Sequence, residues 1–166
     1  ASLAVDPSLL RFVARALGDF FDCSNSVQLD PAVGAILAKT ISSSEHRTAL
    51  EGMVAATRLN RSDLASNIAK KLGVGDPVLH HTAFQCLAKL EASTACFEVI
   101  DTVDASQMQC DGAFLALMRM HKAEVVDGLV KRLAKEQALQ KKKGILVEFV
   151  FCAARWWKNC RWCHWL

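Results

Sequence analysis

Apolar residues recur at intervals of three and four along most of this chain, and polar residues fill the positions between them. That spacing places the apolar side chains on one face of a helix. The clearest stretch runs from residue 76 to residue 135. The pattern predicts an all-α chain with helices over residues 7–20, 31–41, 45–59, 62–72, 77–90, 93–103, 106–120 and 122–134, and a last helix from about 139 to 151.

The expected helix starts share a local signal. Each of the prolines follows an aspartate, at Asp6-Pro7, Asp30-Pro31 and Asp76-Pro77. Aspartate is a good N-cap, and proline suits the first helical position because its missing N–H would have no partner there. We therefore expect helices to begin at these three sites. Ser44 is the expected cap of the helix over residues 45–59, and Ser62 is the expected cap of the helix over residues 62–72.

The helices form pairs that repeat about every 30 residues. A small residue on the first helix of each pair precedes a large apolar one. One helix pair cannot bury its own apolar stripe, so the pairs must stack. The pattern predicts an α-solenoid of about four to five stacked helix pairs, wound as a right-handed superhelix, in which the small residue lets neighbouring first helices approach closely. The equivalent positions are Gly52, Ala83, Ala113 and Gly144, then Met53, Phe84, Phe114 and Ile145, then Leu59, Leu90, Met120 and Phe151, and on the second helices Ile41, Leu72, Val103 and Leu133.

This small–large–x–x–leucine pattern, with its Asp-Pro openings, resembles HEAT repeats of the short bacterial type over most of residues 30–151. The run from Asp76 to Glu136 is also similar to the HEAT-like segment of large bacterial membrane-bound dehydrogenase-type proteins. Those proteins join such repeats to a c-type haem domain. The resemblance implies a helical solenoid and a binding role, and it implies no particular ligand.

The composition fits a folded domain, because 52% of the residues are hydrophobic and 22% are charged. The net charge of +3 is unevenly spread: nine Lys or Arg residues and two acids lie from Lys131 to the end. Lys141, Lys142 and Lys143 stand at the start of the last expected helix, where positive charge opposes the helix dipole. A basic end can meet nucleic acid, anionic lipid or an acidic partner, or it can simply keep the helices hydrated.

The seven cysteines are an odd number, and their spacing matches no small disulfide framework. Cys86, Cys96 and Cys110 fall within the repeats, and Cys23 follows the first helix. Cysteine outside disulfides often behaves as a small buried hydrophobe. These four are therefore predicted to be structural.

The end of the chain differs from the rest, since all four tryptophans lie in its last eleven residues. We divide the chain into a helical repeat domain (1–154) and a basic tail rich in Trp and Cys (155–166). Cys160, Cys163 and His164 spell C-x-x-C-H, the pattern in which two thiols bond haem vinyl groups and the histidine is an axial ligand. The same residues with Cys152 could hold zinc instead. The prediction is no cofactor, with c-type haem or zinc as alternatives.

No catalytic constellation stands out: the sequence shows no Ser-His-Asp set, glycine-rich phosphate loop or carboxylate pair. We predict that the chain is not an enzyme. His80 and His81 are adjacent on a helix, so they point about 100° apart and cannot easily bind one ion.

No stretch reaches the ~18 apolar residues of a membrane span, and no signal peptide is visible. The compartment, cytoplasmic or extracytoplasmic, stays open, as does the oligomeric state.

The expected function is a non-catalytic interaction scaffold, a module of a larger protein that binds a protein or peptide on the solenoid's concave face. The second helices would line that face, and the candidate binding residues at their starts are Ser62, Asp63, Ser93, Glu124 and Asp127. Two alternatives remain. One is an electron-transfer or haem-associated protein that uses the C-x-x-C-H motif, and the other is a nucleic-acid backbone binder that uses the basic end.

Overall fold

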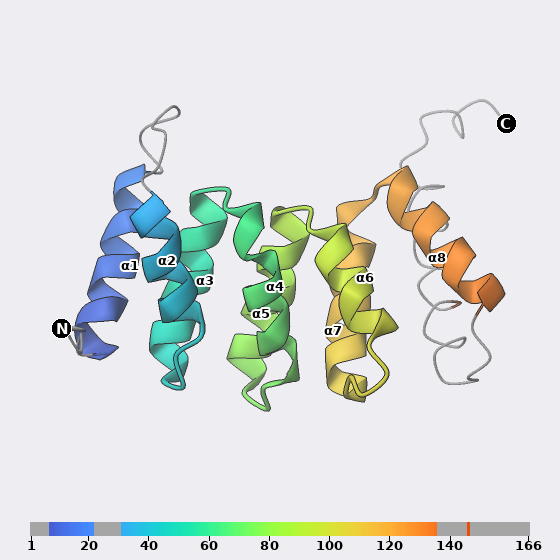
Figure 1. Cartoon of the computed structure of the whole chain (residues 1–166), viewed down its shortest axis with the longest axis horizontal. Coiled ribbons are helices and arrows are strands. Elements are labelled where there is room, and N and C mark those ends of the chain that lie inside the picture. The colour runs from blue at the N-terminus through green and yellow to red at the C-terminus, as the bar shows by residue number, and fades with distance from the viewer. Residues whose placement is uncertain (1–6, 22–30, 136–145, 147–166) are drawn as a thin grey trace, which may run out of the picture.

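The computed structural model describes residues 7–21, 31–135 and 146, and within these ranges helices joined by short turns make up the chain, with no strand (Figure 1). The all-α prediction is therefore confirmed. The helices are α1 (Pro7–Phe21), α2 (Pro31–Ile41), α3 (His46–Arg58), α4 (Ala65–Ala69), α5 (Pro77–Lys89), α6 (Ser93–Asp101), α7 (Gln107–Met120) and α8 (Ala123–Lys135), and short 3₁₀ turns flank α4 at Ser62–Leu64 and Lys70–Gly73. The last expected helix and the tail lie outside the described residues.

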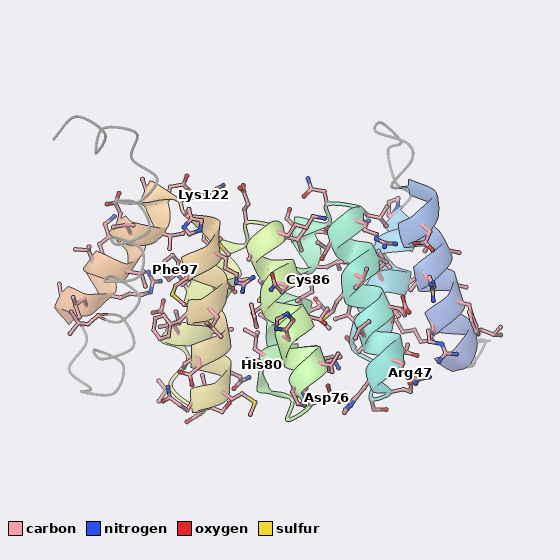
Figure 2. The ribbon with its side chains drawn as sticks, turned by 180° about the vertical axis from the view of Figure 1, so that it is seen from behind. Arg47, Asp76, His80, Cys86, Phe97 and Lys122 are labelled. Carbon is pink, nitrogen blue, oxygen red and sulfur yellow. The ribbon has the colours of Figure 1, made fainter. Side chains whose placement is uncertain are left out.

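The helices lie in two layers. Figure 2 shows α1, α3, α5 and α7 side by side, and each of them packs on the next. We call this the first layer. In Figure 1, α2, α4 and α6 lie in front of it, and they pack on α3, α5 and α7 respectively. We call this the second layer. The chain thus alternates between the layers as it moves from α1 at one end to α8 at the other.

The helices α3, α5 and α7 begin with equivalent caps. Glu45, Asp76 and Ser106 are the three N-cap residues, and each side chain accepts a hydrogen bond from a backbone N–H in the first turn. The Asp76 carboxylate accepts from the Leu79 N–H at 2.9 Å. Ser44 was the expected cap of α3, and that expectation is wrong. The Glu45 carboxylate takes the role because it reaches the N–H groups of both Arg47 and Thr48.

The same three helices also end alike. Asn60, Glu91 and His121 adopt the left-handed conformation, with φ of 51°, 53° and 48°. One such residue directly after a helix is a common way to satisfy its last carbonyl groups. These ends, like the N-caps, recur about every 30 residues. The period expected from side-chain pattern is therefore present in the backbone of α3, α5 and α7.

The element around α4 departs from the expected continuous helix over 62–72. It begins with a 3₁₀ turn, continues as five α-helical residues and ends in a second 3₁₀ turn. Ser62 was expected to cap it, but no side chain caps the start. The 3₁₀ turns pair the end groups of this short helix at a shorter interval than α-helical hydrogen bonds do.

The core confirms most of the expected burial. Met53, Phe84 and Phe114 are buried, as are the small residues that precede them in sequence. The small residue was expected to let neighbouring first helices approach closely, and this expectation is wrong at Gly52. A Cβ atom there would lie 3.0 Å from the Ile41 backbone nitrogen. The missing side chain at Gly52 therefore allows close packing of α2, in the second layer, on α3.

Some residues expected in the core are exposed. Val103 is 90% exposed because α6 ends at Asp101, before the turn of helix that would carry Val103 inward. The apolar spacing of the sequence also places Leu9, Leu10 and Val13 on the inward face of the helix over 7–20, and Val130 on that of the helix over 122–134. On α1, Leu10 and Ala14 are buried, whereas Leu9 and Val13 are exposed. The buried face of α1 is thus rotated from the expected one, and Val130 on α8 is exposed as well.

Polar contacts join successive helix pairs at the same interval of about 30 residues. His46 Nδ1 donates to the Asp76 carboxylate at 3.1 Å, which links the starts of α3 and α5. Lys122, just before α8, forms an ion pair with Glu91, just after α5. Arg132 binds both carboxylate oxygens of Asp101 at 2.8 and 2.6 Å, and this ties α8 to α6. No helix in the described ranges is long and apolar enough to cross a bilayer.

Candidate functional site

The predicted binding residues gather along one edge of the molecule. Ser62, Ser93 and Glu124 lie at the beginnings of the 3₁₀ turn before α4, of α6 and of α8. In Figure 1 these helix starts follow the upper edge of the second layer. Asp127 is exposed one turn along α8. The structure thus places these residues at or near equivalent helix starts, and none of them lines either of the two hollows described below.

Asp63 has a structural partner that the sequence reading missed. Its carboxylate accepts two hydrogen bonds from the Arg61 guanidinium, at 2.8 and 2.7 Å. The hydrogen bond to Arg61 is the main reason that the pKa of Asp63 lies below its ordinary value. Arg61 itself covers Gly34 of α2, where a side chain would collide with the guanidinium. Asp63 therefore helps to hold Arg61 against α2.

A groove opens instead between α4 and α6, with a volume of about 310 Å³. We call it the second-layer groove. Small and apolar side chains alternate with hydrogen-bonding ones around it. Its lining is Ser66, Ala69, Lys70, Ala95, Glu98, Val99, Thr102, Asp104, Ala105 and Gln109. None of the predicted binding residues lines it, because the groove lies along the middle and later turns of the helices and not at their starts.

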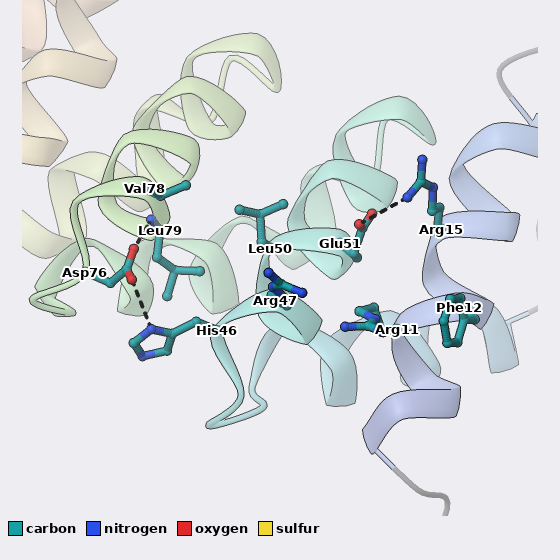
Figure 3. A pocket seen from close by; sticks show the side chains of 10 residues that line it. All are labelled: Arg11, Phe12, Arg15, His46, Arg47, Leu50, Glu51, Asp76, Val78 and Leu79. Atoms are coloured by element: carbon teal, nitrogen blue, oxygen red, sulfur yellow. Dashed lines mark hydrogen bonds and ion pairs between the residues drawn. The ribbon is translucent and has the colours of Figure 1, made fainter.

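A larger hollow of about 590 Å³ lies on the opposite layer (Figure 3). It spans α1, α3 and the start of α5, and we call it the arginine pocket. Arginines from two helices face it together with apolar residues and two acids. Its lining is Arg11, Phe12, Arg15, His46, Arg47, Leu50, Glu51, Asp76, Val78 and Leu79. The sequence reading had assigned no role to any of these arginines.

The acids around the arginine pocket are already engaged. Asp76 caps α5, and the resulting hydrogen bond from the Leu79 N–H, followed by that from His46, lowers the pKa of its carboxyl. Glu51 lies 4.0 Å from Arg15. Nearby Glu45 caps α3. Its pKa is lowered chiefly by the Thr48 hydroxyl and also by the charge of Arg11. The caps of α5 and α3 thus keep the carboxylates of Asp76 and Glu45 in their charged form.

The histidines offer no joint metal site. His80 donates from Nδ1 to the Leu72 carbonyl at 2.8 Å, while His81 is exposed on the adjacent face of α5. Both rings lie edge-on to Phe84, with centroid distances of 6.1 Å for His80 and 4.8 Å for His81. His46 and His121 are exposed. Within residues 7–21 and 31–135, no three His, Cys, Asp or Glu side chains come together to hold a metal ion.

Cys86, Cys96 and Cys110 are buried in the core, as predicted. The Cys86 thiol donates to the Met53 carbonyl at 3.6 Å. Burial raises the pKa of Cys86, and it raises the pKa of Cys96 to about 12. A nucleophilic cysteine needs a depressed pKa and access to solvent. The thiols of Cys86 and Cys96 therefore remain protonated and act as packing groups.

The basic end of the chain is described only at its beginning. Arg132 is bound to Asp101, and its guanidinium lies over the Phe97 ring at 4.0 Å, so it is a structural tie. Lys131 is exposed. The remaining candidates lie outside the described residues, and their roles stay predictions. They are Lys141, Lys142, Lys143, Cys152, Cys160, Cys163 and His164, together with the structural candidate Cys23.

Comparison of the chain with models of known protein families found no match, and comparison with curated proteins found none either.

Proposed function

We propose that this chain is a non-catalytic interaction scaffold, built as a HEAT-like α-solenoid segment, that binds a protein or peptide through its second layer. The recurring caps and left-handed helix ends of α3, α5 and α7 support the solenoid assignment. Stacked helix pairs commonly present an extended surface formed by one helix of each pair. In this chain that surface would be formed by α2, α4, α6 and α8.

The second-layer groove carries the proposal. Ala69, Ala95 and Val99 give it an apolar floor without bulky side chains. Lys70 and Glu98 offer charges of both signs at its border. An extended peptide presents backbone donors and acceptors together with small side chains, and such a mixed lining suits it. The predicted residues Ser62, Ser93 and Glu124 would then extend the contact along the upper edge of the layer.

A peptide-display selection tests this proposal. Random twelve-residue peptides are selected on the immobilised full chain, and the selected peptides are then measured against variants. Ser66→Arg and Val99→Arg place a long side chain in the groove, and each should weaken binding about tenfold or more. Gln85→Arg on α5 of the first layer is the matched control and should change affinity less than about twofold. Selected peptides that bind equally well to all three variants would contradict the groove assignment.

A further inference from the structure

Among the residues that the structure describes, no ion pair is formed by two of the guanidinium groups in the arginine pocket, although the charge of one of them, Arg11, acts on Glu45 from a distance. Within the described part of the chain, the ion pairs of the pocket join Arg15 to Glu51 and to Asp19, and His46 to Asp76. Neither Arg11 nor Arg47 takes part in one. Figure 3 shows Arg11 on α1 and Arg47 on α3, so the two charges border the same hollow from different helices.

Apolar side chains stand beside these two charges. Phe12 is 59% exposed and Val78 is 61% exposed. Leu50 is half-buried between them. The Arg11 guanidinium lies 4.8 Å from the centre of the Phe12 ring. The pocket therefore offers cationic and apolar surface together, drawn from α1, α3 and α5.

We propose that the arginine pocket binds an acidic peptide segment. Its carboxylates would bind Arg11 and Arg47, and separate apolar side chains of the peptide would pack on Phe12 at the α1 end and on Val78 at the α5 end. Guanidinium groups form paired hydrogen bonds with carboxylates, and these are stronger than neutral ones. A volume of about 590 Å³ accommodates a few side chains of a peptide. The site lies on the first layer and is separate from the second-layer groove.

The charges of the lining favour a peptide over a nucleic-acid backbone. The acidic residues Glu51 and Asp76 border the same hollow as the arginines. A phosphate backbone carries a charge at every nucleotide, so some phosphates would lie near these carboxylates. In a peptide, the carboxylates can be spaced so that they meet only Arg11 and Arg47. Apolar side chains of the peptide can then pack on the exposed side chains of Phe12 and Val78 and remove them from water.

Fluorescence anisotropy with the full chain and four labelled probes tests the proposal. The first probe is a twelve-residue peptide with four glutamates around two leucines. The second has glutamine in place of glutamate, the third has serine in place of leucine, and the fourth is a single-stranded DNA of twelve nucleotides. We expect the first probe to bind, with affinity about tenfold lower for the second and about threefold lower for the third.

Three variants locate the binding. Arg11→Gln and Arg47→Gln should each weaken binding of the first probe about fivefold or more, whereas Arg119→Gln on α7 should change it less than about twofold. Thermal melts monitored by circular dichroism establish that the variants fold. Phe12→Ser tests the apolar contact separately, because it removes the exposed ring and leaves every charge in place. It should weaken binding of the first probe about threefold.

The proposal is overturned if the first probe does not bind the unmodified chain, or if Arg119→Gln weakens binding as much as Arg47→Gln. It is also overturned if the DNA binds more tightly than the first probe and depends on Arg11 and Arg47, because the pocket would then be a phosphate site. None of these results bears on the second-layer groove, whose variants are different.

Discussion

At the scale of single residues, close approach between the two layers depends on glycine. A Cβ atom at Gly52 would lie 3.0 Å from the backbone nitrogen of Ile41 and from Cγ2 of Thr40. Backbone atoms inside a packed core yield little, so an added methyl group forces the helices apart. The buried Thr40 contributes to this contact, and its hydroxyl donates to the Ile36 carbonyl at 2.7 Å.

We predict that Gly52→Ala lowers the free energy of unfolding by about 1–3 kcal/mol, in spite of the better helix propensity of alanine. Urea denaturation measures it. Gly75→Ala is the matched control, because a Cβ atom at Gly75 would meet nothing within 4 Å. That variant should be neutral or slightly stabilising, since alanine restricts the unfolded chain. A stabilised Gly52→Ala variant would show that α2 and α3 have room to separate.

The buried thiol of Cys96 makes the free energy of unfolding depend on pH in the alkaline range. The pKa of Cys96 is raised by burial from an ordinary 9.0 to about 12. Between these two values the Cys96 thiol keeps its proton in the folded chain and loses it in the unfolded chain. The contribution of Cys96 to the free energy of unfolding is therefore fully present below pH 9.0 and is lost as the pH rises toward 12. We predict that unfolding free energies measured across this window decline less steeply in Cys96→Ala than in the unmodified chain. Equal slopes in the two proteins would mean that the Cys96 thiol ionises in the folded state.

At the scale of elements, capping decides where the first-layer helices begin. Ser106 and Gln109 form a reciprocal capping box at the start of α7: the Gln109 N–H donates to the Ser106 hydroxyl, and the Ser106 N–H donates to the Gln109 side chain at 2.9 Å. Ser44 lies at the matching turn before α3, but Glu45 carries out the capping there.

We predict that Ser106→Ala lowers the free energy of unfolding by about 1 kcal/mol, the usual cost of losing a serine cap. Ser44→Ala should change it by less than about 0.5 kcal/mol, because an exposed serine that caps nothing contributes little. Thermal or urea unfolding of the two variants side by side measures the difference. Equal losses in both would indicate that Ser44 helps to start α3 after all.

The same comparison shows which parts of the fold could be predicted from sequence. The Asp76-Pro77 start of α5 could be, because cap and first helical residue are both local signals. The break around α4 could not: Ser62 suggested a capped helix start, and no side chain caps it. The orientation of α1 also escaped prediction. Leu9, Leu10 and Val13 are all apolar, and the packing of α1 against α3 and α2 decides that Leu10 is buried while Leu9 and Val13 are exposed.

At the scale of the whole molecule, the candidate sites were the least predictable part. The second-layer groove exists because Ala69 and Ala95 leave space between helices that are far apart in sequence, and small side chains give no signal of that kind. The arginine pocket combines Arg11 with Arg47, which come together only when α1 packs on α3. Sequence reasoning located helix starts well, and it therefore placed the binding residues there.

The stacked arrangement itself has a mechanical consequence. In the first layer each helix packs on its neighbours, so α5 has α3 on one side and α7 on the other, whereas α1 packs on α3 and begins the row. If the proposed solenoid is the right description, the free energy of unfolding is a sum of repeat terms and nearest-neighbour interface terms. A weakened central helix should therefore loosen both of its neighbours, and a weakened end helix should loosen only one.

We predict that Leu87→Ala on α5, where Leu87 is fully buried, lowers the free energy of unfolding by about 2–5 kcal/mol and speeds amide hydrogen exchange in both α3 and α7. Leu10→Ala on α1 should speed exchange in α1 and α3 and leave α7 nearly unchanged. Hydrogen exchange resolved by mass spectrometry on both variants separates these outcomes. An equal acceleration of every helix in both variants would mean that the chain unfolds as one cooperative unit, and the nearest-neighbour description of the proposed solenoid would then fail.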